Sequence, residues 1–217
     1  MLLGLFFAFL ALAKAQNAAR LLSVDEGAPI GTLVGELGSA GPFLIVSPDQ
    51  AEDHFIVNQS NGEIRTRTKL DREAKDKYSL SAIPGQGDTI QITIQVLDVN
   101  DNAPDFGQGE FKIDIPENIP PGTRRKLPSA IDLDASGVEA YTIVSGNVGE
   151  AFDVDFDRAK DSLDLVVKGS LDREKLDKYS MVLVASDDGQ PPRSASMTLT
   201  VQVQDLNDSP PLFSKQR

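Results

Sequence analysis

The sequence has no cysteine and no tryptophan, and its only histidine is His54. Without cysteine, the chain has no disulfide framework, no thiolate metal site and no cysteine nucleophile. One histidine is too few for a site with several imidazole ligands, so a zinc or copper site is not expected. Carboxylate and amide oxygens are the only metal ligands that the chain has in number, and these suit hard cations.

Basic residues are fewer than acidic residues in this sequence. The 21 Lys and Arg stand against 33 Asp and Glu, for a formal net charge of -12. Nucleic acids and anionic membranes need a basic surface, so the balance argues against both as partners. An acidic excess commonly serves solubility alone. A metal-binding role requires that the acids cluster in a way that solubility would not demand.

Long apolar runs are also missing, except at the N-terminus. Residues 2–12 are almost continuously apolar, and Ala13, Lys14 and Ala15 follow as a small-x-small cleavage signal. The run is too short to span a bilayer comfortably. We expect a signal peptide at 1–15; the alternative is a buried strand or helix of a cytosolic domain. The expected product is extracellular, either secreted or the N-terminal piece of a longer plasma-membrane protein.

Three motifs occur twice in the same order, about a hundred residues apart. LDRE stands at 70–73 and at 171–174, DVNDNAP at 98–104 recurs as DLNDSPP at 205–211, and EGAPIGT at 26–32 recurs as ENIPPGT at 117–123. A period of this length marks whole domains rather than solenoid units. We expect repeat 1 at 16–103, repeat 2 at 104–213, and a tail or the start of a following repeat at 214–217.

Each repeat has the pattern of β-strands. Apolar residues alternate with polar ones over 90–96 and again over 197–203, which predicts strands with one buried and one wet face. Turn signals such as Asn61-Gly62 separate the runs. About seven short strands in roughly a hundred residues match an immunoglobulin-like sandwich. The expected fold class is all-β, with two tandem Greek-key β-sandwiches, and Pro104 is expected to end the last strand of repeat 1.

The segment between the repeats carries the chemistry. It reads Asp98-Val99-Asn100-Asp101-Asn102, with four oxygen-bearing side chains in five residues. Calcium takes six to eight oxygen ligands, which is more than one short segment can supply. Because the loops of a sandwich cluster at its two ends, other acids are expected to join these residues: Glu26, Asp71, Glu73, Asp132, Asp134 and Asp187.

Together these motifs are similar to those of the cadherin superfamily. The resemblance covers residues 17–213 and rests on PEN at 116–118, LDRE in both repeats, DVNDNAP at 98–104, DLD at 132–134 and VASDDG at 184–189. It implies cadherin repeats with three calcium ions between neighbours. Two ions would be held by Glu26, Asp71, Glu73, Asp101 and Asp134 with the carbonyl of Val99. The third would be held by Asn100, Asp132, Asp134 and Asp187 with the carbonyl of Asn102.

The resemblance also implies a second half-site at the far end of repeat 2. Its members are Glu117, Asp172, Glu174, Asp205, Asn207 and Asp208. Repeat 1 lacks the early Asp-x-Asp and has Pro84 where repeat 2 has Asp187. Both features are what an N-terminal repeat without an upper neighbour would show.

Other motifs have simpler interpretations. Asn58-Gln59-Ser60 fits a glycosylation acceptor, although such triplets also arise by chance. Asn207-Asp208-Ser209 fits the same pattern, but Pro210 argues against it. The basic residues 124–126 are expected in a solvated loop, or less readily in a protease site. His54 is expected to be a partly exposed strand residue.

The resulting functional hypothesis is calcium-dependent cell–cell adhesion by a calcium-rigidified extracellular module. The expected partner is another cadherin, bound homophilically or heterophilically. Strand-swapping cadherins insert an N-terminal tryptophan, so the resemblance favours a protocadherin-like or Fat/Dachsous-like overlap. The alternatives are a secreted calcium-binding protein without an adhesive role, and a hydrolase that uses paired carboxylates. We expect no enzyme, because the acids follow an interdomain repeat and no substrate cleft is indicated.

Overall fold

The computed structural model describes residues 18–38 and 41–207. The expected signal peptide at 1–15, Asp208 and the segment 214–217 therefore lie outside the described residues. The chain divides after Val99 into two compact units, which we call the first unit (1–99) and the second unit (100–217). The finer domain limits expected from the sequence remain a prediction.

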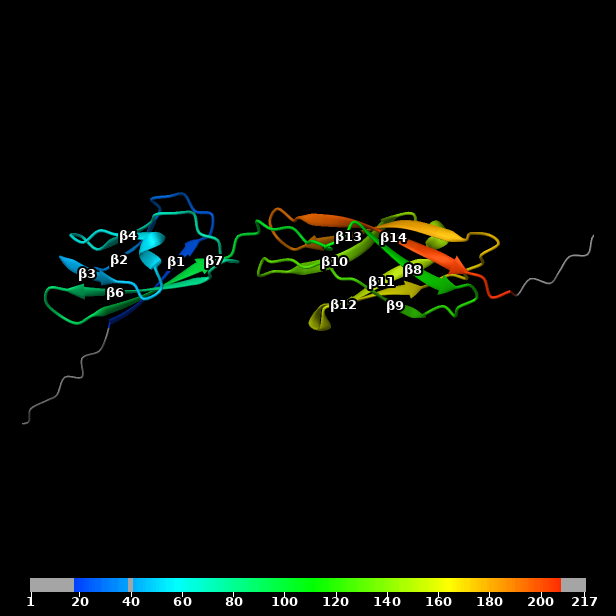
Figure 1. The fold of residues 1–217 in the computed structure, drawn as a ribbon, viewed down its shortest axis with the longest axis horizontal. Coiled ribbons are helices and arrows are strands. Elements are labelled where there is room, and N and C mark those ends of the chain that lie inside the picture. Colours follow the sequence, from blue (N-terminus) through cyan, green and yellow to red (C-terminus); the bar gives the residue numbers. More distant parts are fainter. Residues whose placement is uncertain (1–17, 39–40, 208–217) are drawn as a thin grey trace, which may run out of the picture. The chain divides into compact units, whose positions relative to one another are not determined.

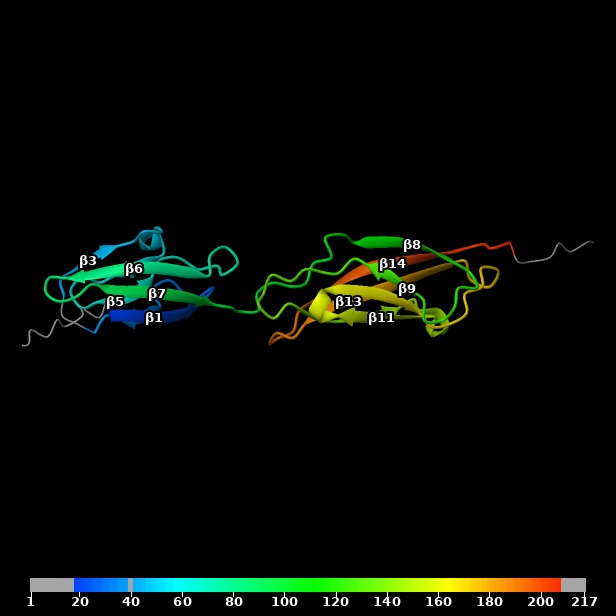
Figure 2. The ribbon, with the colours of Figure 1, turned by 90° about the horizontal axis from the view of Figure 1, so that it is seen from below.

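The first unit is a sandwich of two sheets (Figure 1). One sheet has the strand order β1-β7-β6-β3, and the other has the order β2-β5-β4. Figure 2 shows β6, β7 and β1 lying side by side. The elements are β1 (Ala18–Asp25), β2 (Leu33–Glu36), β3 (Phe43–Val46), the 3-10 helix η1 (Ala51–Asp53), β4 (Phe55–Val57), β5 (Glu63–Thr66), β6 (Lys77–Pro84) and β7 (Ile90–Leu97).

The second unit repeats this topology, strand for strand. Its sheets have the orders β10-β13-β14-β8 and β11-β12-β9. The parallel pairing of β1 with β7 recurs as the parallel pairing of β8 with β14. The elements are β8 (Glu110–Pro116), β9 (Arg124–Leu127), β10 (Val138–Ser145), η2 (Val148–Glu150), β11 (Phe152–Asp157), η3 (Arg158–Lys160), β12 (Ser162–Val167), β13 (Lys178–Asp187) and β14 (Ser194–Gln204).

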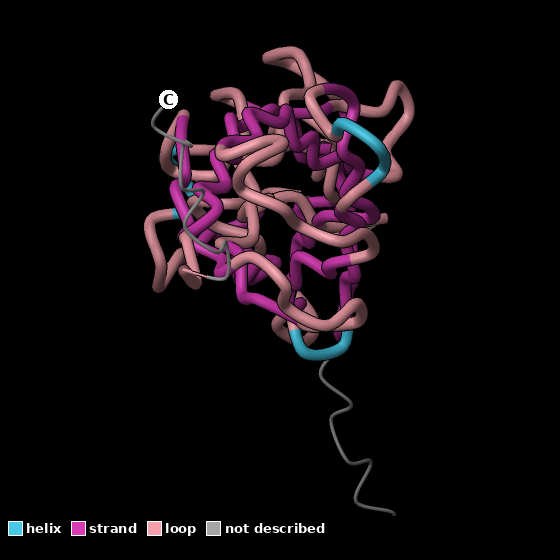
Figure 3. The backbone as a smooth tube through the Cα atoms, turned by 90° about the vertical axis from the view of Figure 1, so that its right-hand side faces the viewer, coloured by secondary structure: helices cyan, strands magenta, loops and turns pink. Residues whose placement is uncertain are grey.

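The alternating sequence pattern forms the two cores. In β7, Ile92, Ile94 and Val96 are buried and the intervening residues are more exposed. In β14, Leu199, Val201 and Val203 take the same role. Burial of one face of a strand removes apolar area from water at about 25 cal/mol per Å², which stabilises the sandwich. Strands and loops make up nearly all of the described chain (Figure 3), so the predicted all-β fold class is confirmed.

Three local expectations are corrected. β7 ends at Leu97, so Pro104 does not end that strand. The basic residues 124–126 lie in β9 rather than in a loop, because Leu127 is buried and β12 supplies carboxylates opposite them. Lys126 Nζ, for example, lies 3.1 Å from Asp164 Oδ1. Asp187 is the last residue of β13 rather than part of the following turn.

His54 follows η1 rather than lying within a strand. Its Nδ1 lies 3.0 Å from Thr68 Oγ1, and its ring centroid lies 4.9 Å from that of Tyr78. These contacts give it a structural role. Among the described residues, no helix has the length and apolar character needed to cross a membrane.

Candidate functional site

Glu26 is the anchor of the acidic end of the first unit. It follows β1 directly and is only 4% exposed. Its Oε1 accepts a hydrogen bond from Val99 N at 2.9 Å, and its Oε2 accepts one from Arg72 N at 2.8 Å. Buried carboxylates need such donors, because burial without them costs several kcal/mol. The two bonds tie the end of β1 to the LDRE turn and to the segment that follows β7.

Two further carboxylates gather at Glu26. Oxygens of Glu26, Glu73 and Asp98 lie within 4.8 Å of one another. Arg72 partly neutralises the group through ion pairs with Glu73 and, at 2.5 Å, with Asp98. Burial raises the pKa of Glu73, and the hydrogen bond and negative charge of Glu26 raise it further. One arginine thus faces three carboxylates at this spacing.

Asp71 does not join this group of three. Its Oδ1 accepts a hydrogen bond from Ala74 N at 3.0 Å, and its carbonyl accepts one from Lys75 N. The side chain therefore shapes the LDRE turn and remains exposed to solvent.

In the second unit, Asp134 is the corresponding buried acid, at 4% exposed. It lies in the loop between β9 and β10. Its carboxylate accepts hydrogen bonds from Asn102 N at 3.1 Å and from Asn102 Nδ2 at 2.8 Å. Asn102 Nδ2 also reaches Asp101 Oδ1 at 3.0 Å. Asn102, the last residue of the Asp-Val-Asn-Asp-Asn segment, is thus held by an acid 32 residues later in the sequence.

Asp187 and Asn100 form a second contact in this unit. Asp187 is 5% exposed, and its Oδ1 accepts from Gly189 N at 3.0 Å and Arg193 N at 2.8 Å. Burial acts to raise the pKa of Asp187, but the N–H groups of Arg193 and Gly189 outweigh it, so the pKa is lowered. A Cβ on Gly189 would lie 1.9 Å from Asn100 Nδ2. Only glycine therefore allows Asn100 to pack here, where its Nδ2 donates to the carbonyl of Pro191.

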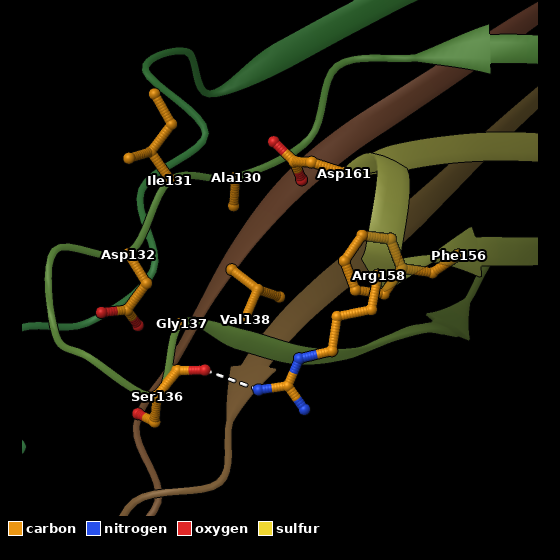
Figure 4. A pocket seen from close by; sticks show the side chains of 9 residues that line it. All are labelled: Ala130, Ile131, Asp132, Ser136, Gly137, Val138, Phe156, Arg158 and Asp161. Atoms are coloured by element: carbon orange, nitrogen blue, oxygen red, sulfur yellow. Dashed lines mark hydrogen bonds between the residues drawn. The ribbon is translucent and has the colours of Figure 1, made fainter.

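Asp132 lies beside a shallow cavity of about 270 Å³ (Figure 4). Its Oδ1 accepts a hydrogen bond from Asp134 N at 2.9 Å, which closes the DLD loop. The cationic side chain in the cavity is Arg158, which donates to Ser136 O at 2.6 Å and pairs with Glu139. Because these charges are paired within the protein, we assign no ligand to the cavity.

The far end of the second unit reproduces the arrangement around Glu26. Glu117 is 1% exposed; its Oε1 accepts from Leu206 N at 2.8 Å and its Oε2 from Arg173 N at 3.0 Å. Oxygens of Glu117, Asp172 and Glu174 lie within 4.8 Å of one another. Asp205 Oδ2 pairs with Arg173 Nη1 at 3.1 Å, and Asp205 Oδ1 accepts from Asn207 N at 2.6 Å.

Within each unit, then, most of the expected residues come together. Sequence patterns did not reveal the residues that support the acids. These are the arginine within each LDRE motif, Gly189 next to Asn100, and Lys175, whose Nζ lies 2.7 Å from Asp172 Oδ2. The repeated LDRE was visible as a signal for the arginines, and Gly189 stood in the VASDDG motif without a predicted packing role. That the acids of the two units share ions remains a prediction.

The donors suit a hard cation. All are carboxylate, amide or carbonyl oxygens, the set that calcium prefers. Two buried oxygens, Asp187 Oδ2 and Asn100 Oδ1, have no hydrogen-bond partner among the described residues. A buried oxygen without a donor calls for an explanation, and a bound metal ion is one of the recognised explanations. The chain therefore has acidic groups that can hold a metal.

The comparisons with known proteins agree with this arrangement. Residues 111–204 match the family model of the cadherin domain. The chain is 40% identical to Protein dachsous of Drosophila melanogaster over 213 residues, and 35% identical to human Protocadherin-16 over 211 residues. These matches cover 93% and 90% of the chain, but only 6% of either relative. The crystal structure of Protocadherin Gamma C5 EC1-3 matches with a TM-score of 0.78 and 28% identity, covering 88% of this chain and 67% of that chain.

The two sandwiches therefore have the fold of cadherin repeats, and the relatives are adhesion proteins rather than enzymes. The alternative of a hydrolase therefore has no support from the relatives, and the chain is not an enzyme. Its repeated motifs, its topology and its relatives all indicate that the chain belongs to the cadherin family.

Proposed function

We propose that the chain is a calcium-rigidified extracellular module of a cell-surface cadherin and that it acts in calcium-dependent cell–cell adhesion. The observation that carries the proposal is the pair of acidic sets on either side of the peptide bond between Val99 and Asn100. Glu26, Glu73 and Asp98 gather before it, and the buried oxygens of Asp134 and Asp187 belong to the unit after it.

In this proposal, calcium ions link the two sets. Two ions take oxygens from Glu26, Asp71, Glu73, Asp101 and Asp134, together with the carbonyl of Val99. A third takes Asn100, Asp132, Asp134, Asp187 and the carbonyl of Asn102. The unpartnered oxygens Asp187 Oδ2 and Asn100 Oδ1 support this third site. The cluster of Glu26, Glu73 and Asp98 supports the first two, because a divalent cation would relieve the repulsion among carboxylates at this spacing.

The mechanical role follows from the shortness of the connection. A five-residue segment without glycine or serine is not a flexible spacer, yet it has no core of its own. Ions that bind oxygens from both units and from the segment would remove its remaining rotational freedom. The repeats would then present their surfaces to a partner in a defined orientation. We propose another cadherin as that partner, at the extracellular face of the plasma membrane.

Titration calorimetry with calcium, with magnesium as the matched control, tests the ion sites. Extracellular modules bind calcium with Kd values of about 0.1 to 1 mM, and we expect binding in that range with selectivity over magnesium. Small-angle scattering with and without chelator tests rigidification, since calcium should narrow the distribution of interdomain distances. Heat of binding that is absent up to several millimolar calcium would contradict the proposal.

Adhesion needs a separate readout. Beads that carry the chain should aggregate in calcium and disperse in chelator, whereas beads that carry a calcium-binding variant should stay dispersed. Calcium binding without any aggregation, alone or against beads that carry a related cadherin, would favour the alternative of a calcium-binding module without an adhesive role.

A further inference from the structure

The turn between β4 and β5 holds Asn58 through its side-chain oxygen, as in an Asx turn. Its side-chain Oδ1 accepts hydrogen bonds from Ser60 N at 2.9 Å and from Asn61 N at 3.4 Å. Its backbone N–H donates to the carbonyl of Glu63, and its carbonyl accepts from Gly62 N. The oxygen of the amide and the whole backbone of the residue are therefore engaged in the turn.

The amide nitrogen is not engaged. Neither Asn58 Nδ2 nor Ser60 Oγ makes a hydrogen bond to another described residue, and Asn58, Gln59 and Ser60 are all exposed. An asparagine whose oxygen is held while its nitrogen faces solvent, with a serine hydroxyl two residues later, matches the acceptor sequence Asn-x-Ser. Such acceptors lie in surface turns, where a bulky sugar does not disturb packing.

The second unit uses a carboxylate as the acceptor in the connection between the corresponding strands. In the connection between β11 and β12, Asp157 ends β11 and caps η3, and its Oδ1 accepts a hydrogen bond from Lys160 N. A carboxylate therefore performs a capping task there, as expected for a group that needs only an acceptor oxygen. The turn requires an acceptor oxygen at position 58, but it does not require the amide nitrogen of Asn58.

We propose that Asn58 is an N-glycosylation site. In the step, Nδ2 attacks the anomeric carbon of an oligosaccharide carried on a polyprenyl diphosphate. The bond between nitrogen and that carbon forms, and the bond between the carbon and the diphosphate oxygen breaks. The polyprenyl diphosphate leaves with the bonding pair, and one amide proton passes to a base of the oligosaccharyl transferase. The modification rests on the secretion that the proposed function requires.

The position keeps the sugar away from the candidate metal ligands within the first unit. The turn bonds to the start of β3, where Phe43 N donates to the carbonyl of Gln59 at 3.2 Å. Glu26 is bonded instead to Val99 and Arg72 at the end of the unit where β1 and β7 stop. Calcium binding should thus be the same with and without the glycan.

The triplet 207–209 serves as a contrast. It has the same acceptor pattern, but Pro210 follows it, and Asn207 has a positive φ of 52°. Ser209 and Pro210 lie outside the described residues. A proline next to the hydroxyl residue restricts the backbone that the acceptor must adopt, so we expect this triplet to remain unmodified.

The test uses residues 16–217 behind a foreign signal peptide in cultured animal cells, so that secretion does not depend on residues 1–15. Intact mass is measured before and after peptide N-glycosidase, which converts a modified asparagine to aspartate. The wild-type chain should carry one N-glycan, and Asn58→Asp and Ser60→Ala should carry none. Ser60→Thr should keep the glycan, and Asn207→Asp should leave the mass of the sugar unchanged.

Asn58→Asp is the decisive variant, because aspartate keeps the acceptor oxygen that bonds to Ser60 N and removes the amide nitrogen. It should unfold at the temperature of the enzymatically deglycosylated wild type, so that loss of the sugar is not loss of the fold. A secreted wild-type chain without any glycan, or a glycan that persists in Asn58→Asp, would overturn the proposal. Calcium binding measured on the same samples tests the proposed function separately.

Discussion

Glu26 in the first unit and Glu117 in the second sit in the same frame of hydrogen bonds, but their neighbours differ. Arg72 and Asp98 have side chains that are 20% and 27% exposed, whereas Arg173 and Asp205 are 44% and 47% exposed. The position three residues after the LDRE aspartate is Ala74 in the first unit and Lys175 in the second. Only the second unit thus pairs that aspartate, Asp172, with a lysine, at 2.7 Å.

The two units thus share a backbone arrangement at these acidic ends, but they differ in the charges next to the LDRE aspartate. At the Glu117 end, Lys175 already supplies a positive charge to Asp172 and lowers its pKa by a hydrogen bond. At the Glu26 end, Lys75 turns away, with its Nζ 2.9 Å from the carbonyl of Asp49 and 4.4 Å from the Tyr78 ring centroid. Asp71 is left for solvent or for a cation from outside the protein.

The opposite ends of the units differ even more. β6 ends at Pro84, whereas β13 ends at the buried Asp187. The described part of the first unit shows a cluster of three acids only at the Glu26 end. The second unit carries buried acids at both ends, in Asp134 and Asp187 at one and Glu117 at the other. The second unit therefore has acidic groups at both ends, and the first unit has them at one end among the described residues.

The largest expected effect comes from Asp134→Ala compared with Asp172→Ala. Asp134 is proposed to touch two ions and to hold Asn102, so its loss should weaken calcium binding by about tenfold or more, or about 1.4 kcal/mol. Asp172 is already paired with Lys175, so its loss should change the affinity by less than roughly threefold. Calorimetry on both variants measures the difference. Equal losses would mean that the proposed division of ligands between the two ends is wrong.

A smaller effect should follow from exchanging the residues that distinguish the LDRE turns. Ala74→Lys should place a cation next to Asp71 and weaken calcium binding by roughly two- to threefold, since an exposed ion pair has a modest free energy. Lys175→Ala should free Asp172 and leave the first set of ions unaffected. Calcium titrations at low and high salt provide the control, because screening should reduce the effect of Ala74→Lys. An unchanged affinity in Ala74→Lys would show that Asp71 is not a ligand.

The smallest effect concerns pH in the absence of calcium. Burial and Glu26 raise the pKa of Glu73 above its ordinary value of 4.5. The folded first unit then holds a proton that the unfolded chain has released, so its stability should fall as pH rises from 4.5 through the raised pKa. Hydrogen exchange of core amides in chelator measures the slope. Glu73→Gln should flatten it, and Glu174→Gln in the second unit should not.

Much of the fold could be predicted because period-two patterns report burial directly. The alternation over 90–96 and 197–203 predicted the strands whose apolar residues are buried in β7 and β14. Residues 124–126 misled, because three consecutive basic residues are typical of a loop. Carboxylates on β11 and β12, including Asp155 and Asp164, pair with the basic residues of β9 and offset their repulsion. No local sequence pattern indicates that these strands lie next to β9.

The sequence by itself determined the two repeats, their all-β class and the acids available to bind a cation, since these depend on periodicity and on residue type. Tertiary structure alone decided which carboxylate and amide oxygens accept hydrogen bonds within the protein and which do not. Glu26 meets Val99 across 73 residues, and Asp134 meets Asn102 across 32. Contacts of that separation arise only when strands pair, because the ends of a sandwich collect loops from distant parts of the chain.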